Sequence, residues 1–201
     1  SGSTWTDNRP INAQYKYSLS QQIYTPAQLG DIPFGIKTLG CYNSVSNAVT
    51  RNVEIYMVET EKNAFEAGTD WVTVTAADLV FSGNVTFASS GWNTITLTKT
   101  FTYTATKNVA LVVNDKTGEQ VSSNYPKCRV NTGLTDVQSK YAINNDAAYD
   151  ATNLTEVNGY DRYKSVSQLR IGTDSPAKPN WPAISKSSST TATATWMGEG
   201  D

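Results

Sequence analysis

The chain has 201 residues, with 16 lysines and arginines against 18 acidic residues, a formal charge of −2 and no histidine. The absence of a long basic run argues against nucleic acid as a partner, and no apolar stretch reaches the roughly 20 residues that insertion across a bilayer requires. Without imidazole, Ser-His-Asp and Cys-His nucleophilic sites are excluded, and the commonest catalytic zinc ligand is missing.

Short strands separated by turn residues are predicted along most of the chain. Val53, Ile55 and Met57 alternate with polar or exposed positions, which predicts a strand with one buried face. The run 109–113 is apolar on both faces, as in a central strand that is covered on both sides. The predicted strands span residues 15–24, 34–42, 51–59, 79–87, 92–98, 109–113, 138–143 and 165–171.

Helix is predicted only at residues 25–30 and 75–79, and neither segment exceeds about two turns. Eight or more short antiparallel strands at this spacing predict an all-β fold, an antiparallel two-sheet β-sandwich of jelly-roll type.

The segment 115–164 departs from this rhythm because it is rich in Asn, Asp, Ser and Gly and has few aliphatic residues. It carries five tyrosines: Tyr125, Tyr141, Tyr149, Tyr160 and Tyr163. Long loops in compact domains are commonly functional, and rings of this size tend to pack on something. The tyrosines therefore either form a ligand site or cover the open end of the sandwich.

Six segments carry a family resemblance: SQQIYTPAQLG, GIKTLGCYN, TRNVEIYMVET, FEAGTDWVTVTAADLVFSGNVTF, GWNTITLTKTFTY and NVALVVNDKTG. Over roughly residues 20–118, with a weaker echo at QLRIG, the chain resembles β-sandwich modules that precede fibronectin type III repeats in secreted, multimodular surface proteins of Bacteroidetes. Such modules occur in adhesin-like proteins and beside glycan-degrading domains. The resemblance implies an exported accessory module, secreted or at the cell surface, and it names no ligand.

The end of the chain, PNWPAISKSSSTTATATW, resembles the first strands of a fibronectin type III domain. We therefore expect a β-sandwich binding module over residues 1–173, a linker over 174–179 and the start of a fibronectin type III-like domain over 180–201, with the chain cut just inside that next module. Chains built from successive β-modules are more often binding or presentation devices than lone enzymes.

Carbohydrate binding is the favoured function, because sugar rings stack on aromatic side chains while their hydroxyls bond to amide, carboxylate and guanidinium groups. Trp71 and Trp92 are less specific candidates for ligand binding, because both lie in segments that resemble structural motifs of the family. The candidate ligand-binding residues are Tyr125, Tyr149, Tyr160, Tyr163, Asn124, Arg129, Asp161, Arg162, Trp71 and Trp92.

The expected partners are a polysaccharide or glycan and neighbouring domains of the same polypeptide, with the module itself a monomer. A protein-binding adhesin segment or a structural spacer is the alternative. A glycoside hydrolase is the second alternative, because it needs only two carboxylates. Glu54 and Glu59 are the pair to consider, but their odd spacing puts them on opposite faces of one unbroken strand, so no catalytic residue is assigned.

No cofactor is expected. Residues 114–119 or 143–150 offer oxygen ligands for a structural calcium ion, but neither follows the spacing of the twelve-residue calcium loop, and Asp/Asn pairs also form ordinary turns. Cys41 and Cys128 are too isolated for a metal or redox motif. A disulfide between them and two buried thiols fit the sequence equally well.

Overall fold

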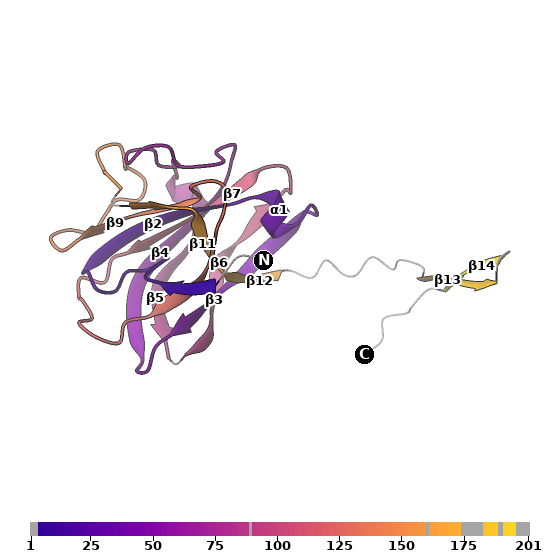
Figure 1. Cartoon of the computed structure of the whole chain (residues 1–201), viewed down its shortest axis with the longest axis horizontal. Coiled ribbons are helices and arrows are strands. Elements are labelled where there is room, and N and C mark those ends of the chain that lie inside the picture. The colour runs from indigo at the N-terminus through magenta and orange to yellow at the C-terminus, as the bar shows by residue number, and fades with distance from the viewer. Residues whose placement is uncertain (1–3, 89, 160, 174–182, 189–190, 196–201) are drawn as a thin grey trace.

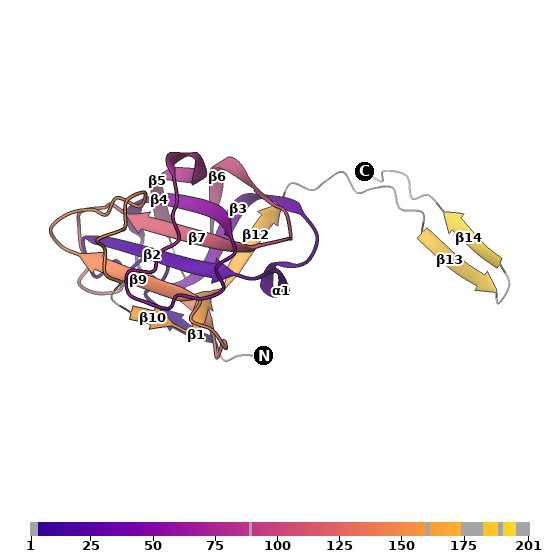
Figure 2. The same ribbon diagram turned by 90° about the horizontal axis from the view of Figure 1, so that it is seen from above.

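The computed structural model describes residues 4–88, 90–159, 161–173, 183–188 and 191–195, and it is an all-β structure. Two six-stranded sheets, each built of antiparallel pairs, lie against each other (Figures 1 and 2). The strand-rich, two-sheet architecture expected from the sequence is confirmed. Across these residues no helix has the length and apolar character needed to span a membrane.

The front sheet is organised around β3 (Phe34–Ser44), which pairs with β6 (Gly91–Tyr103) along most of its length. The opposite side of β3 pairs with β12 (Leu169–Thr173) and, near its end, with β8 (Lys127–Thr132). The remaining strands of this sheet, β1 (Thr4–Asp7) and β11 (Ser165–Ser167), both pair with β8. Because β12 pairs with β3 alone, its second edge has no strand partner in the described part of the chain.

The back sheet has the order β10-β9-β2-β7-β4-β5. Its strands are β2 (Tyr17–Tyr24), β4 (Val49–Thr60), β5 (Leu79–Phe87), β7 (Asn108–Asp115), β9 (Ser139–Asn144) and β10 (Asp161–Tyr163). The two helical segments are single turns, α1 (Pro26–Leu29) and η1 (Ala76–Asp78), close to where helix was predicted.

The main core fills the space between the sheets with the inward residues of alternating strands, such as Ile36 of β3, Val53 of β4 and Leu111 of β7. A second cluster lies on the outer face of the back sheet, where Tyr56 and Val112 contact Ala151 and Leu154 of the 145–159 loop. Strand β7 is therefore buried along its whole length, as its two apolar faces predict.

Val53, Ile55 and Met57 of β4 are buried as predicted, but the second face of this strand is partly buried too. Tyr56 is only 6% exposed on the second face of β4, because the loop cluster covers it. Strands β1, β8 and β10 were not predicted, since each offers at most two apolar side chains to reveal its period. The single strand predicted at 165–171 is two strands, which Gln168 separates.

Near the C-terminus, β13 (Ala183–Ser188) and β14 (Thr191–Thr195) pair as an antiparallel hairpin. The expected linker, 174–179, lies outside the described residues.

The disulfide considered for Cys41 and Cys128 is not present, and both residues are buried thiols, 7% and 4% exposed. Cys128 lies opposite Asn43 in the β3–β8 pairing, so Cys41 is its diagonal neighbour. Diagonal positions on paired strands are about 7–8 Å apart, whereas a disulfide needs β-carbons at roughly 3.5–4.5 Å. The register therefore disfavours the bond.

Candidate functional site

An aromatic pair lies on the outer face of the front sheet. Along β3 the buried residues Leu39, Cys41 and Asn43 alternate with Gly40 and Tyr42, so Tyr42 points away from the core. Trp92 of β6 is directly opposite Tyr42, and the two rings meet edge to face with centroids 5.8 Å apart. Trp92 is 37% exposed, one of two large apolar side chains exposed to this degree in the described residues.

Each ring of this pair carries an arginine. The guanidinium carbon of Arg129 (β8) lies 3.6 Å from the Tyr42 ring centroid, and that of Arg170 (β12) lies 4.4 Å from the Trp92 ring centroid. These are the distances of cation–π contacts. We call the four residues Tyr42, Trp92, Arg129 and Arg170 the outer platform. Both arginines are solvent-exposed, so their polar ends remain accessible.

The arrangement of the outer platform depends on Gly40. In the pairing register Arg170 and Thr94 both lie opposite Gly40, on its two sides, while Trp92 lies opposite Tyr42. The Arg170 side chain must therefore cross β3 diagonally, over Gly40, to reach Trp92. A β-carbon on Gly40 would lie 3.4 Å from Cβ of Arg170 and 3.3 Å from Oγ1 of Thr94, so the missing side chain keeps this crossing open.

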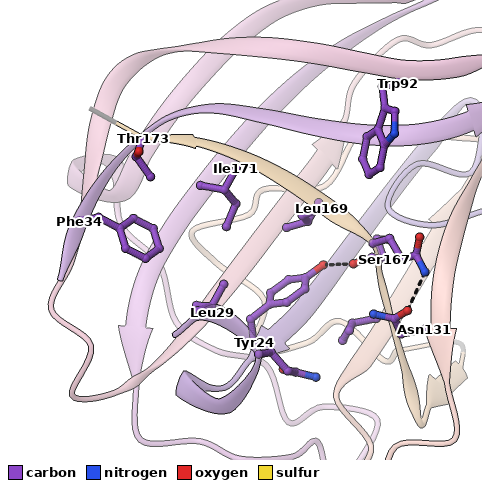
Figure 3. A pocket seen from close by; sticks show the side chains of 12 residues that line it. Tyr24, Leu29, Phe34, Trp92, Asn131, Ser167, Leu169, Ile171 and Thr173 are labelled. Atoms are coloured by element: carbon purple, nitrogen blue, oxygen red, sulfur yellow. Dashed lines mark hydrogen bonds between the residues drawn. The ribbon is translucent and has the colours of Figure 1, made fainter. Parts of the chain in front are cut away.

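A pocket of about 620 Å³ adjoins the outer platform, and Trp92 belongs to both. We call it the β12 pocket, because it lies along β12 and is lined by Leu169, Ile171 and Thr173 of that strand. In Figure 3, Trp92 and Asn131 lie toward one end of it and Phe34 and Thr173 toward the other, with Tyr24 and Leu29 below the strand. Its volume is in the range of small-molecule sites.

Polar groups occur at the Trp92 end of the β12 pocket. Gln168 donates from Nε2 to Oδ1 of Asn131 at 2.7 Å, and Tyr24 donates from its hydroxyl to the Ser167 carbonyl at 2.9 Å (Figure 3). Burial raises the pKa of Tyr24 well above 10, so this phenol remains a donor at neutral pH. Asn131 Nδ2 and Gln168 Oε1 have no partner among the described residues, which leaves one donor and one acceptor for a ligand.

The predicted residues Trp71 and Tyr149 lie together on the other side of the molecule, in the cluster that covers the back sheet. Trp71 donates from Nε1 to the Val157 carbonyl at 2.7 Å, and the Lys140 ammonium is 4.0 Å from its ring centroid. Burial raises the pKa of Tyr149 to about 12. Both rings hold loops onto the sheet.

Arg162 and Tyr163 are on β10 at the edge of the same sheet. Arg162 donates to the carbonyls of Phe65 and Glu66, which fixes the loop before Trp71. The Tyr163 ring stacks on Tyr141 at 6.1 Å, and Arg9 lies 3.8 Å from its centroid. Tyr160 and the side chain of Asp161 lie outside the described residues.

Asn124 and Tyr125 precede β8, next to the end of β3. Asn124 has a positive φ of 57°, and its Oδ1 accepts a hydrogen bond from the Ser46 amide at 2.9 Å, so it stabilises a turn. Tyr125 has the Lys127 ammonium 5.2 Å from its ring centroid, and Lys127 pairs with Ser44 two residues beyond Tyr42. Of the ten predicted residues, Trp92 and Arg129 are thus in the outer platform and Tyr125 is near its end.

The acidic residues considered from the sequence have other partners. Glu54 accepts from the Tyr56 hydroxyl and from Lys116 at 2.8 Å, and Glu59 accepts from Thr104. Asp115, in the 114–119 segment, is paired with Arg51 at 2.7 Å. Oδ1 of Asp150, in the 143–150 segment, accepts a hydrogen bond from the Thr152 amide. No group of three or more Cys, Asp or Glu side chains suited to a metal is found within the described ranges.

Sequence reasoning missed Tyr42 and Arg170, although a signal was present. Leu39 and Cys41 share one face of their strand, which places Tyr42 on the other face. Arg170 lies between Leu169 and Ile171, so the same strand period places Tyr42 and Arg170 on the outer face. Their proximity depends on the register of β12 against β3, which one-strand periodicity does not contain.

Comparisons with protein-family models, with curated proteins and with solved structures found no match to this chain.

Proposed function

We propose that the chain is a non-catalytic carbohydrate-binding module of an exported, multimodular protein, and that the glycan lies across the outer platform with one end at the β12 pocket. The observation that carries this proposal is Trp92, an exposed indole that is held in place by Tyr42 and borders a pocket with polar groups at the same end. An exposed ring on a rigid strand offers a sugar a flat apolar surface at little cost in side-chain entropy.

Polar groups beside the ring support the same proposal. Asn131 and Gln168 present an amide donor and a carbonyl acceptor within the pocket that Trp92 lines. Sugars present hydroxyl groups at the ring edge and C–H groups on the ring face, so a site needs both kinds of contact. The back sheet offers a poorer site, because the cleft beside Trp71 has a volume of only about 120 Å³ and the indole N–H of Trp71 already has a partner.

The wider setting belongs to the proposal as well. We infer a jelly-roll-type module, secreted or at the cell surface, that precedes a fibronectin type III-like domain. The family resemblance over residues 20–118 supports this setting, and the β13–β14 hairpin is compatible with the first strands of such a domain.

A glycan array followed by calorimetry tests the function. We expect binding to at least one polysaccharide, and we expect Trp92→Ala to weaken it about 5- to 150-fold, the loss of about 1–3 kcal/mol typical of a stacked ring. The matched control is Trp71→Ala, a tryptophan of the back sheet whose loss should lower the melting temperature and leave the affinity of the folded fraction unchanged. A protein that binds no glycan in any class, although folded, would contradict the proposal.

A second candidate function is protein binding by strand addition. The free edge of β12 and the apolar lining of the pocket along it, with Leu169 and Ile171, are the features that favour it. An added strand would slow hydrogen exchange of β12 amides and would tolerate Trp92→Ala. A partner protein that produces this pattern would favour the adhesin function over the glycan-binding one.

A further inference from the structure

The two arginines of the outer platform have no counter-charge among the described side chains. Among the described residues no carboxylate lies within 4.0 Å of Arg129, Arg170 or the neighbouring Lys127, and neither guanidinium donates a hydrogen bond to the protein. Arg51, in contrast, is paired with Asp115 and donates to two backbone carbonyls. Contacts with Tyr42 and Trp92 nonetheless hold the guanidinium groups of Arg129 and Arg170 over the two rings, and their N–H groups have no acceptor among the described residues.

The strands of the front sheet carry an excess of basic residues. Its six strands contain five basic residues, Lys37, Lys99, Lys127, Arg129 and Arg170. They contain one acidic residue, Asp7, in the edge strand β1. The whole chain has a formal charge of −2, so the acidic residues are concentrated elsewhere, including Glu54, Glu59 and Asp115 on the back sheet. Of the basic residues, Lys99 is bonded to the Ala77 carbonyl of η1, whereas Lys127, Arg129 and Arg170 lie at or next to the outer platform. Basic charge that is gathered at one exposed site attracts anionic ligands.

We propose that the ligand of the outer platform is an acidic polysaccharide, one whose sugars carry carboxylate groups. This inference rests on the proposed carbohydrate-binding function and names its substrate class. A guanidinium presents parallel N–H donors that match the two oxygens of a carboxylate, and such charge-assisted pairs are stronger than hydrogen bonds between neutral groups. Arg170 lies over one face of the Trp92 ring and Arg129 over Tyr42, so a sugar that contacts the exposed remainder of Trp92 has a cation beside it.

The same features argue against a neutral glycan as the main ligand. A neutral sugar that covered the outer platform would remove water from Arg129 and Arg170 without supplying an anion, and an incompletely paired charge costs affinity. Gly40 supports the same conclusion, because the space left by its missing side chain lets Arg170 lie over Trp92 while the guanidinium remains solvent-exposed. Uronate residues combine a stackable sugar ring with a carboxylate.

The test compares polymers that share one backbone and differ in charge. Polygalacturonate and its fully methyl-esterified form, each titrated into the intact chain in 0.15 M NaCl, form the central pair, with alginate and hyaluronate as further acidic probes and dextran and xyloglucan as neutral ones. We expect at least one acidic polymer to bind, and esterification of the carboxylates of that polymer to weaken its binding at least tenfold. Neutral polymers that bind as tightly as the acidic ones would overturn the acidic-ligand inference and leave the carbohydrate-binding function standing.

Two variants and a control separate this site from general charge attraction. Arg129→Gln and Arg170→Gln should each weaken the acidic polymer 5- to 20-fold and leave the melting temperature within a few degrees of the parent. Lys107→Gln removes an equal charge at an exposed position away from the front sheet, where Lys107 pairs with Glu61, and should change affinity less than twofold. If Lys107→Gln weakens binding as much as the arginine variants, the attraction is nonspecific and the proposal is wrong. If none of the probes binds, acidic or neutral, the carbohydrate-binding function itself fails.

Discussion

Lys140 is a lysine that the fold buries completely, with no exposed surface. Its ammonium donates to the carbonyls of Ala67 and Gly68, at 3.1 and 2.6 Å, and lies 4.0 Å from the Trp71 ring centroid. Burial lowers its pKa from 10.5 to about 8, and the nearby charge of Asp70 only partly opposes this. Lys140 therefore links strand β9 to the loop that contains Ala67 and Gly68.

This environment predicts a pH dependence of stability. The folded-state pKa, about 8, is below the unfolded-state value near 10.5, so between these values the unfolded chain binds the proton more strongly. The free energy of unfolding should therefore rise with pH from about 8, with a slope of up to about 1.4 kcal/mol per pH unit, and should be insensitive to Lys140 below pH 7. Urea unfolding between pH 7 and 9.5 measures it.

The control for Lys140 is Lys140→Met, which keeps an unbranched apolar chain beside the Phe65 and Trp71 rings and removes the titrating group. The free energy of unfolding of this variant should not change over the same pH range. Equal slopes for parent and variant would show that Lys140 does not cause the effect.

Arg51 and Asp115 form the second buried charge site at the residue scale. Their side chains are 1% and 0% exposed, and Arg51 also donates to the carbonyls of Tyr15 and Glu119 at 3.0 and 2.6 Å. We expect Asp115→Asn to lower the free energy of unfolding by about 3–5 kcal/mol, because it leaves a buried guanidinium without its carboxylate. The matched control is Glu61→Gln, in the exposed pair with Lys107, which should change stability by less than about 1 kcal/mol. Similar losses in the two variants, measured by urea unfolding, would contradict this account of Arg51.

At the scale of elements, the 145–159 loop acts as a cover for the back sheet. Ala151 and Leu154 are buried against Leu19, Tyr56 and Val112, and Tyr149 packs beside them. Asn114 of β7 donates to the Tyr149 carbonyl at 3.0 Å, so the loop is held by its backbone as well.

Tyr149→Ala should therefore cost stability and not affinity. We expect a loss of about 2 kcal/mol, less than for a fully buried aromatic residue because Tyr149 is half-buried, with glycan affinity unchanged. Thermal unfolding together with calorimetry checks both parts. A variant with the parent's melting temperature and reduced glycan affinity would place the site back in the tyrosine-rich segment.

Elements also show what the sequence could predict and what it could not. The β5 strand was predicted at its observed bounds, Leu79–Phe87, because turn signals flank an alternating segment. Strand β8 escaped because KCRVNT presents only Cys128 and Val130 to the core. For the same reason Arg129 was assigned to a loop site and not to a strand face. The outer platform joins four strands, β3, β6, β8 and β12, so only their register brings its residues together.

At the scale of the whole molecule, the two sheets have different outer faces. Loops bury the outer face of the back sheet around Tyr56 and Val112, whereas the outer face of the front sheet exposes Trp92, Arg129 and Arg170. The two views in Figures 1 and 2 show the sheets as separate layers, so a ligand on the front sheet need not disturb the covered face. Because of this asymmetry, we propose that the front sheet binds the ligand and that the contacts on the outer face of the back sheet stabilise the fold.

The indole N–H signals of the chain test this placement most directly. A ¹H–¹⁵N spectrum resolves the tryptophan side chains, and the spectra of Trp92→Phe and Trp71→Phe assign two of them. On addition of oligosaccharides of the acidic polymer that binds, we predict that the Trp92 signal shifts in proportion to saturation. The Trp71 signal, from an N–H that already bonds the Val157 carbonyl, stays in place. A saturable shift of Trp71, or of any other tryptophan while Trp92 is unmoved, would contradict it.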